Sequence, residues 1–105
     1  MTKEQDINIL NELKALQAKH NLSDINVAYI IGTTSSYFTH YYNSDRAISD
    51  NMHDKIICLI NILEELPSYN LYRLSNETKE NYKRRKHQAL TVIKKMYDKN
   101  YEDGF

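Results

Sequence analysis

The sequence predicts an all-α fold, and three observations lead to this prediction. The chain has 105 residues with only one proline and two glycines, too few to serve the many tight turns of an all-β protein. Apolar residues recur at intervals of three and four positions, the period of an amphipathic helix. Residues that cap helices precede these segments. We therefore expect a bundle of four to five helices followed by a long helix at the carboxyl end.

The first two helices are expected at residues 3–20 and 24–31. Ser23 suits the cap before the second helix, and Gly32 lies where the chain needs a positive φ to leave it. The residues expected to face inward are Ile7, Leu10, Leu13, Leu16, Gln17, Val27, Ala28 and Ile31. A third helix is expected to begin at Ser35 with Thr34 as its cap, and its inward residues are Phe38 and Tyr41.

The carboxyl half of the chain predicts two more helices. One covers residues 51–66 after Ser49 or Asp50 as its cap, with an apolar face of Met52, Ile56, Leu59, Ile60 and Leu63. The other covers residues 76–100 after Ser75 or Asn76 as its cap. Its narrow apolar stripe cannot stabilise an isolated helix in water, so this helix must pack on its own chain or on a second copy.

Composition restricts the class of protein. Hydrophobic residues make up 41% and charged residues 27% of the chain, as in a soluble globular domain. The single cysteine, Cys58, lies in an apolar run, where burial is the expected role, and one cysteine cannot form a disulfide within the chain. We find no signal peptide and no apolar run near the ~20 residues that a membrane span needs. A cytoplasmic protein without a membrane partner is therefore expected.

The stretch from Leu22 to Ser49 resembles the xenobiotic-response-element family, the helix-turn-helix proteins of the Cro and phage-repressor type. The matching positions are Leu22, Ser23, Val27, Ala28, Ile31, Gly32, Thr34, Phe38 and Tyr41, with Ser44, Arg46 and Ser49 in the following loop. The resemblance covers about residues 5–66. It implies a phage-repressor-like helix-turn-helix DNA-binding domain at residues 1–67, in which Ala28 allows two helices to cross closely.

The same resemblance implies a set of DNA contacts. Base-reading positions are Ser35, Ser36, Thr39 and His40, and positions near the sugar-phosphate backbone are Ser23, Tyr37, Asn43 and Arg46. An idle surface histidine is the alternative interpretation of His40. Asp24 stands where the family often has a glutamine that touches DNA, and a carboxylate there repels phosphates unless it only caps the helix or accepts from a cytosine amine.

Charge is balanced over the chain but distributed unevenly. The 14 basic and 14 acidic residues cancel. Residues 79–99 hold eight basic and two acidic residues, whereas residues 1–49 hold four basic and five acidic residues. A solvated helix face is the favoured interpretation of the run from Lys83 to Lys86, and a phosphate or RNA contact is the alternative.

Residues 68–105 are predicted to form a helical dimerisation segment. The residues expected to pair two chains are Tyr82, Ala89, Leu90, Ile93, Met96 and Tyr97. The alternative is that this helix folds back over the fourth helix of its own chain. A two-fold dimer presents two recognition helices to a palindromic double-stranded operator.

The leading functional prediction is a sequence-specific DNA-binding transcriptional regulator, a dimeric repressor from a phage or mobile element. It needs no cofactor and no metal, and no enzymatic role is expected, because no nucleophile–base pair or carboxylate pair can be assigned to a common pocket. The alternative is a protein–protein interaction module of the same fold, such as a phage inhibitor or an antitoxin-like protein. Tyrosine is frequent here, with nine residues, and tyrosines often anchor protein interfaces.

Overall fold

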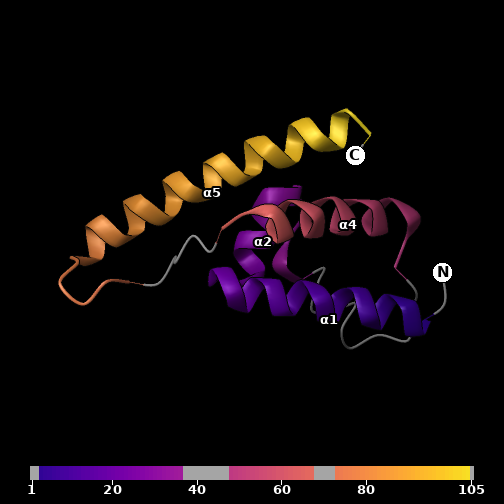
Figure 1. Cartoon of the computed structure of the whole chain (residues 1–105), viewed down its shortest axis with the longest axis horizontal. Helices are drawn as coiled ribbons and strands as arrows, with labels where there is room; N and C mark the ends of the chain where they lie inside the picture. Colours follow the sequence, from indigo (N-terminus) through magenta and orange to yellow (C-terminus); the bar gives the residue numbers. More distant parts are fainter. Residues whose placement is uncertain (1–2, 37–47, 68–72, 105) are drawn as a thin grey trace.

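The computed structural model describes residues 3–36, 48–67 and 73–104, with side chains from residue 6 onward. Within these ranges the protein is all-α and contains no strand, which confirms the all-α part of the prediction. The helices are α1 (Lys3–His20), α2 (Asp24–Ile31), α4 (Asp50–Glu65) and α5 (Lys79–Glu102) (Figure 1). None of the helices in the described ranges combines the length and the apolar character that a membrane crossing requires. Phe38 and Tyr41 lie outside the described residues.

Helix α1 packs along α4 and buries one narrow row of residues. That row consists of Asp6, Leu10, Leu13, Gln17 and His20, which follow one another at intervals of three or four positions and so share one face. The prediction that Ile7 faces inward is wrong, because its side chain is 46% exposed. The buried row begins instead at the polar Asp6, about 100° around the helix from Ile7.

Helix α4 lies at the centre of the core, between α1 on one side and α2 and α5 on the other. All five residues of its predicted apolar face are buried, together with Cys58 and Ile62. The helix begins at Asp50, one residue earlier than predicted, and Ser49 caps it by accepting a hydrogen bond from the Met52 N–H at 3.2 Å. Burial raises the pKa of the Cys58 thiol, which makes it a poor nucleophile.

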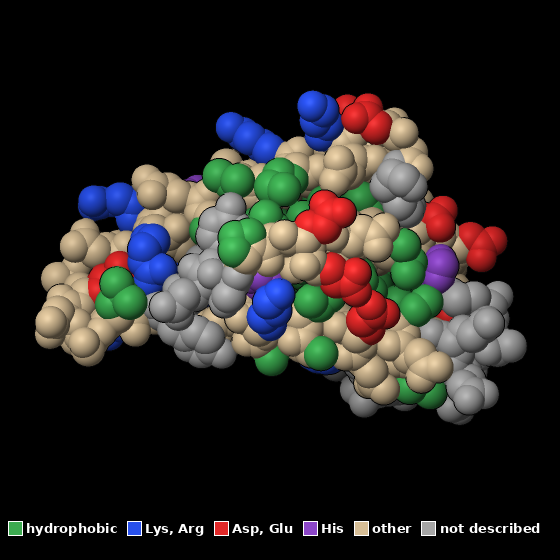
Figure 2. Space-filling view, in the orientation of Figure 1, with side chains coloured by type: hydrophobic (Ala, Val, Ile, Leu, Met, Phe, Trp, Pro, Cys, Tyr) green, Lys and Arg blue, Asp and Glu red, His purple; other side chains and the backbone are tan. Residues whose placement is uncertain are grey.

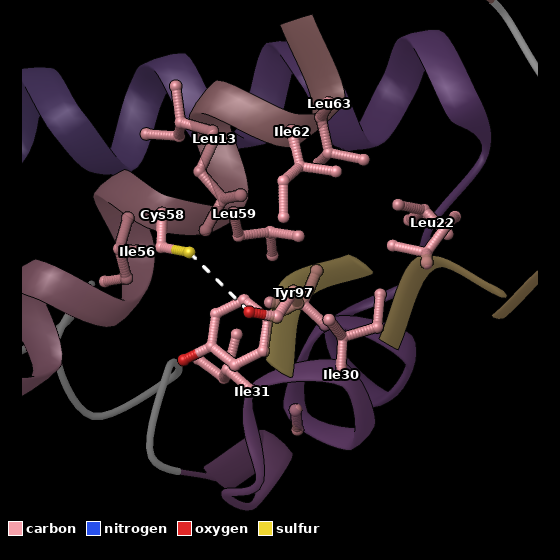
Figure 3. Packing of buried hydrophobic residues seen from close by; sticks show 14 of the residues in the cluster. Leu13, Leu22, Ile30, Ile31, Ile56, Cys58, Leu59, Ile62, Leu63 and Tyr97 are labelled. Atoms are coloured by element: carbon pink, nitrogen blue, oxygen red, sulfur yellow. Dashed lines mark hydrogen bonds between the residues drawn. The ribbon is translucent and has the colours of Figure 1, made fainter. Parts of the chain in front are cut away.

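Helix α5 folds back over α2 and α4 of its own chain (Figure 1). Leu90, Ile93 and Tyr97 are buried in the cluster that also contains the core residues of α1, α2 and α4, and Figure 3 shows Tyr97 beside Ile30, Ile31 and Cys58. The core therefore extends across the predicted division at residues 67 and 68. Of the six predicted dimerisation residues, Tyr82, Ala89 and Met96 are only partly buried within the chain.

The predicted start of α5 at residue 76 is wrong. The helix begins at Lys79, and Thr78 caps it by accepting a hydrogen bond from the Asn81 N–H at 3.1 Å. The preceding residues form a turn held by Glu77, whose carboxylate accepts hydrogen bonds from the Leu74 N–H at 3.2 Å and from the Arg85 guanidinium at 2.9 Å. Ser75 and Asn76 are part of this turn, so they do not cap the helix.

Candidate nucleic-acid interface

The amino terminus of α2 is fixed by a reciprocal pair of hydrogen bonds. The Ser23 hydroxyl accepts from the Asn26 N–H at 3.2 Å, and the Asn26 side-chain oxygen accepts from the Ser23 N–H at 3.0 Å. This capping box satisfies two N–H groups that the helix itself leaves without partners. Ser23 therefore caps α2 as predicted, and the hydrogen bond from the Asn26 N–H fixes the position of its hydroxyl.

The carboxyl terminus of α2 ends in a tight turn at Gly32. Its backbone has φ 77° and ψ 40°, the left-handed conformation, and the N–H groups of Gly32 and Thr33 both donate to the Ala28 carbonyl at 2.9 Å. Helical backbone resumes at Ser35. Three residues therefore separate α2 from the next helical residues. The buried Ala28 lies one turn before this connection.

Substituting Gly32 with alanine should lower the free energy of unfolding by about 1 kcal/mol, because left-handed backbone is unfavourable for a residue with a Cβ atom. A Cβ at this position meets no atom within 4 Å, so the cost comes from the backbone alone. Chemical denaturation measures this difference.

Gly104→Ala is the matched control for that measurement. Gly104 has φ +80° and equally open surroundings, but it follows the end of α5, where the chain can relieve strain by fraying. A Gly32→Ala protein as stable as the Gly104→Ala protein would show that the turn does not depend on left-handed backbone.

Few of the predicted DNA-contacting side chains fall in the described ranges. Ser23 and Ser36 are exposed and Ser35 is half-buried. The hydroxyl of Ser36 lies 3.0 Å from that of Thr34, so these two side chains hold each other at the start of the helical stretch. The other predicted positions, Tyr37, Thr39, His40, Asn43 and Arg46, lie outside the described residues.

Asp24 is tied to α1 by two side chains that the sequence pattern did not link to it. Its carboxylate accepts hydrogen bonds from the Lys14 ammonium at 2.9 Å and from the Gln17 amide at 3.0 Å. Burial acts to raise the pKa of Asp24, but the hydrogen bonds from Gln17 and Lys14 and the Lys14 charge outweigh it, so the pKa is lowered. Asp24 therefore stays ionised at neutral pH, and Lys14 balances its charge.

Two apolar side chains on α2 remain exposed to solvent. Ile25 is 68% and Tyr29 is 43% exposed, and they stand one helical turn apart. The Lys94 ammonium lies 5.5 Å from the centre of the Tyr29 ring and donates a hydrogen bond to the Ile30 carbonyl at 3.2 Å. Lys94 thus joins α5 to the end of α2, and Tyr29 stays partly exposed beside it.

Charges of opposite sign are distributed unevenly over the surface. Figure 2 shows most of the visible Lys and Arg side chains along the margin where α5 lies in Figure 1, and most of the visible Asp and Glu side chains over the region of α1 and α4, although acidic side chains also lie near both ends of α5. Glu12 and Glu64 are neighbours in that acidic region, since a hydrogen bond with Glu64, burial and the Glu64 charge together raise the pKa of Glu12. The basic surface is therefore concentrated on α5.

Within the described ranges, no three His, Cys, Asp or Glu side chains gather closely enough to hold a metal ion. Comparison of the chain with protein-family models, with curated proteins and with solved structures finds no match in any of the three.

Proposed function

We propose that the protein is a sequence-specific DNA-binding transcriptional regulator of the phage-repressor helix-turn-helix type. The observation that supports this function best is the connection after α2. A capped helix ends at a left-handed glycine, and helical backbone resumes three residues later at Ser35. A short turn of this kind, often containing glycine, joins the two helices of a DNA-binding helix-turn-helix.

The core gives a physical reason why such a motif can present a rigid surface. Val27, Ala28, Ile30 and Ile31 are buried, so α2 is held from two sides by α4 and α5. A helix that follows α2 after a three-residue turn starts from a fixed point. In the proposal its residues Ser35, Ser36, Thr39 and His40 read base edges in the major groove, where serine and threonine can donate or accept.

The charge on Asp24 does not count against the proposal. Its carboxylate is partnered by Lys14 and Gln17, so phosphates near the start of α2 meet an ion pair and not an isolated negative charge. Ser23 and its neighbours can then contact the sugar-phosphate backbone, as proposed also for Tyr37, Asn43 and Arg46.

The proposal includes a homodimer on a palindromic operator and repression by occlusion of a promoter in the cytoplasm. In the single chain, Leu90, Ile93 and Tyr97 are core residues. If α5 keeps this position in the dimer, the contact between the two chains is formed by the partly buried Tyr82, Ala89 and Met96 and by their exposed neighbours. A phage or another mobile element is the proposed source.

The test selects the preferred operator from random DNA duplexes and measures its affinity. Ser36→Ala and His40→Ala should each weaken binding to the selected duplex about threefold to tenfold, because a single hydrogen bond contributes about 0.5–1.5 kcal/mol. Ser75→Ala and His87→Ala replace the same residue types at exposed positions on or next to α5, and they should leave the sequence preference unchanged. Equal and weak affinity for all duplexes would end the proposal.

The exposed Ile25 and Tyr29 favour a second candidate function, a protein–protein interaction module that no longer reads DNA. Aromatic residues are enriched in interface anchors, and these two side chains stand on the same helix as the proposed motif. This candidate predicts a stoichiometric protein partner whose binding is abolished by Ile25→Asp and is indifferent to Ser36→Ala. The DNA-binding function predicts instead that Ser36→Ala weakens binding to the selected duplex.

A further inference from the structure

The amino half of α5, residues 79–88, extends beyond the part of the protein formed by α1, α2 and α4, which we call the body (Figure 1). No residue from Lys79 to Gln88 is buried, and the first buried residue of the helix is Leu90. The projecting half is nevertheless anchored at its start. Thr78 caps it, and Glu77 joins the preceding turn to Arg85 through two hydrogen bonds of 2.9 Å. About 15 Å of helix therefore carries no buried side chain in this half of α5.

One row of side chains runs along the entire helix, and it changes from apolar to basic residues where the helix extends beyond the body. The members of this row follow one another at intervals of four and three positions, and they are Lys79, Lys83, Lys86, Leu90, Ile93 and Tyr97. In the carboxyl half the row is apolar and buried. In the amino half it consists of lysines. An apolar partner does not suit this face, because burying unpaired ammonium groups is costly.

The projecting half also carries an excess of positive charge. Residues 79–88 contain five basic residues and one acidic residue, whereas residues 1–78 contain six basic and ten acidic residues. Arg85 pairs with Glu77, and Lys86 lies over the Tyr82 ring at 5.8 Å. Within the described ranges Lys79, Lys83 and Arg84 have no ion-pair partner, so their charges face solvent. A partner for this surface must be strongly anionic.

We propose that the amino half of α5 contacts the phosphates of the DNA duplex that the protein binds; this inference rests on the proposed DNA-binding function. The acidic body supplies little attraction for a polyanion, and neutral charge overall gives none at long range. Lysines one helical turn apart stand about 5–6 Å apart, which suits contacts with separate phosphates. The helix holds them in a fixed row, so less conformational freedom is lost on binding than from a flexible basic tail.

The test compares two double variants with equal loss of charge. Lys79→Gln with Lys83→Gln removes two exposed cations from the projecting half, and Lys95→Gln with Lys99→Gln removes two exposed cations from the carboxyl half of the same helix. Affinity for the selected duplex, and for a duplex of scrambled sequence, is measured across a range of salt concentrations. Thermal unfolding of each variant verifies that the fold is intact.

We expect the first double variant to bind both duplexes more weakly, with a salt slope shallower by about 2, because each lost phosphate contact removes about 0.9 from the slope. The second double variant should keep the slope of the parent protein. Equal losses in both variants, or no change in the first, would overturn the inference while leaving the proposed function intact. If the parent protein binds no duplex, the proposed function and the inference fail together.

Discussion

Replacing Ile93 with alanine should lower the free energy of unfolding by about 2–4 kcal/mol, the usual cost of truncating a large buried aliphatic side chain. Ile93 is fully buried and belongs to the single core cluster, although it stands on the last helix of the chain. The alanine variant leaves a cavity between α5 and the helices beneath it. Denaturant unfolding measures the loss, provided that the parent protein unfolds in two states.

Val92→Ala is the matched control, because Val92 precedes Ile93 directly and is 46% exposed. We expect it to change stability by less than about 0.5 kcal/mol. Both proteins should be measured at two concentrations that differ a hundredfold. An unfolding midpoint that rises with concentration would show that the folded chains associate, and an Ile93→Ala protein as stable as the control would mean that α5 is not part of the core.

The sequence predicts the first and last residues of a helix well where nearby capping residues determine them. The predicted ranges of α1 and α2 agree with the structure, because Ser23 and Gly32 fix the limits of α2 through contacts with residues only three or four positions away. The start of α5 is different. Ser75 and Asn76 are good capping residues, but Glu77 pairs with Arg85, eight positions later, and this pair holds them in a turn.

Burial that depends on the arrangement of helices could not be predicted. Ile30 is fully buried in the core that α2 forms with α5 and α4, and nothing near Ile30 in the sequence indicates that α5 packs there. Asp6 and His20 are buried polar residues whose partners lie more than 40 positions away: Asp6 accepts from the Ile48 N–H, and His20 Nε2 donates to the Leu63 carbonyl at 3.0 Å. The spacing of apolar residues gives no signal that an aspartate or a histidine at the end of the row is buried, so it misses both.

For the candidate interface, the sequence predicts the local backbone geometry but not the contacts between helices. The cap at Ser23 and the turn at Gly32 follow from residue type and spacing. The state of Asp24 does not, because it depends on Lys14 and Gln17, which reach it across the junction between α1 and α2. The sequence also does not show that the lysine row of α5 lies on the part of the helix that projects from the body, because this depends on where α5 packs on the other helices.

Asp6→Ala should lower the free energy of unfolding by about 1–3 kcal/mol, because it leaves the buried Ile48 N–H without its hydrogen-bond acceptor. One oxygen of the fully buried Asp6 carboxylate accepts from the Ile48 N–H at 2.9 Å, and the other has no hydrogen-bond partner among the described residues. Ile48 is itself a core residue, so this bond joins the start of α1 to the residues that lead into α4.

Two further variants test whether the hydrogen bond to Ile48 accounts for this loss. Asp6→Asn keeps a side-chain oxygen that can accept from Ile48, so we expect it to retain most of the stability that Asp6→Ala loses. Asp54→Ala removes a carboxylate whose side chain is 60% exposed, and it should change the unfolding free energy by less than about 0.5 kcal/mol. If Asp6→Asn is as destabilised as Asp6→Ala, a side-chain oxygen that accepts from the Ile48 N–H is not sufficient at this position. If both variants match Asp54→Ala, the contact between Asp6 and Ile48 contributes nothing measurable to the fold.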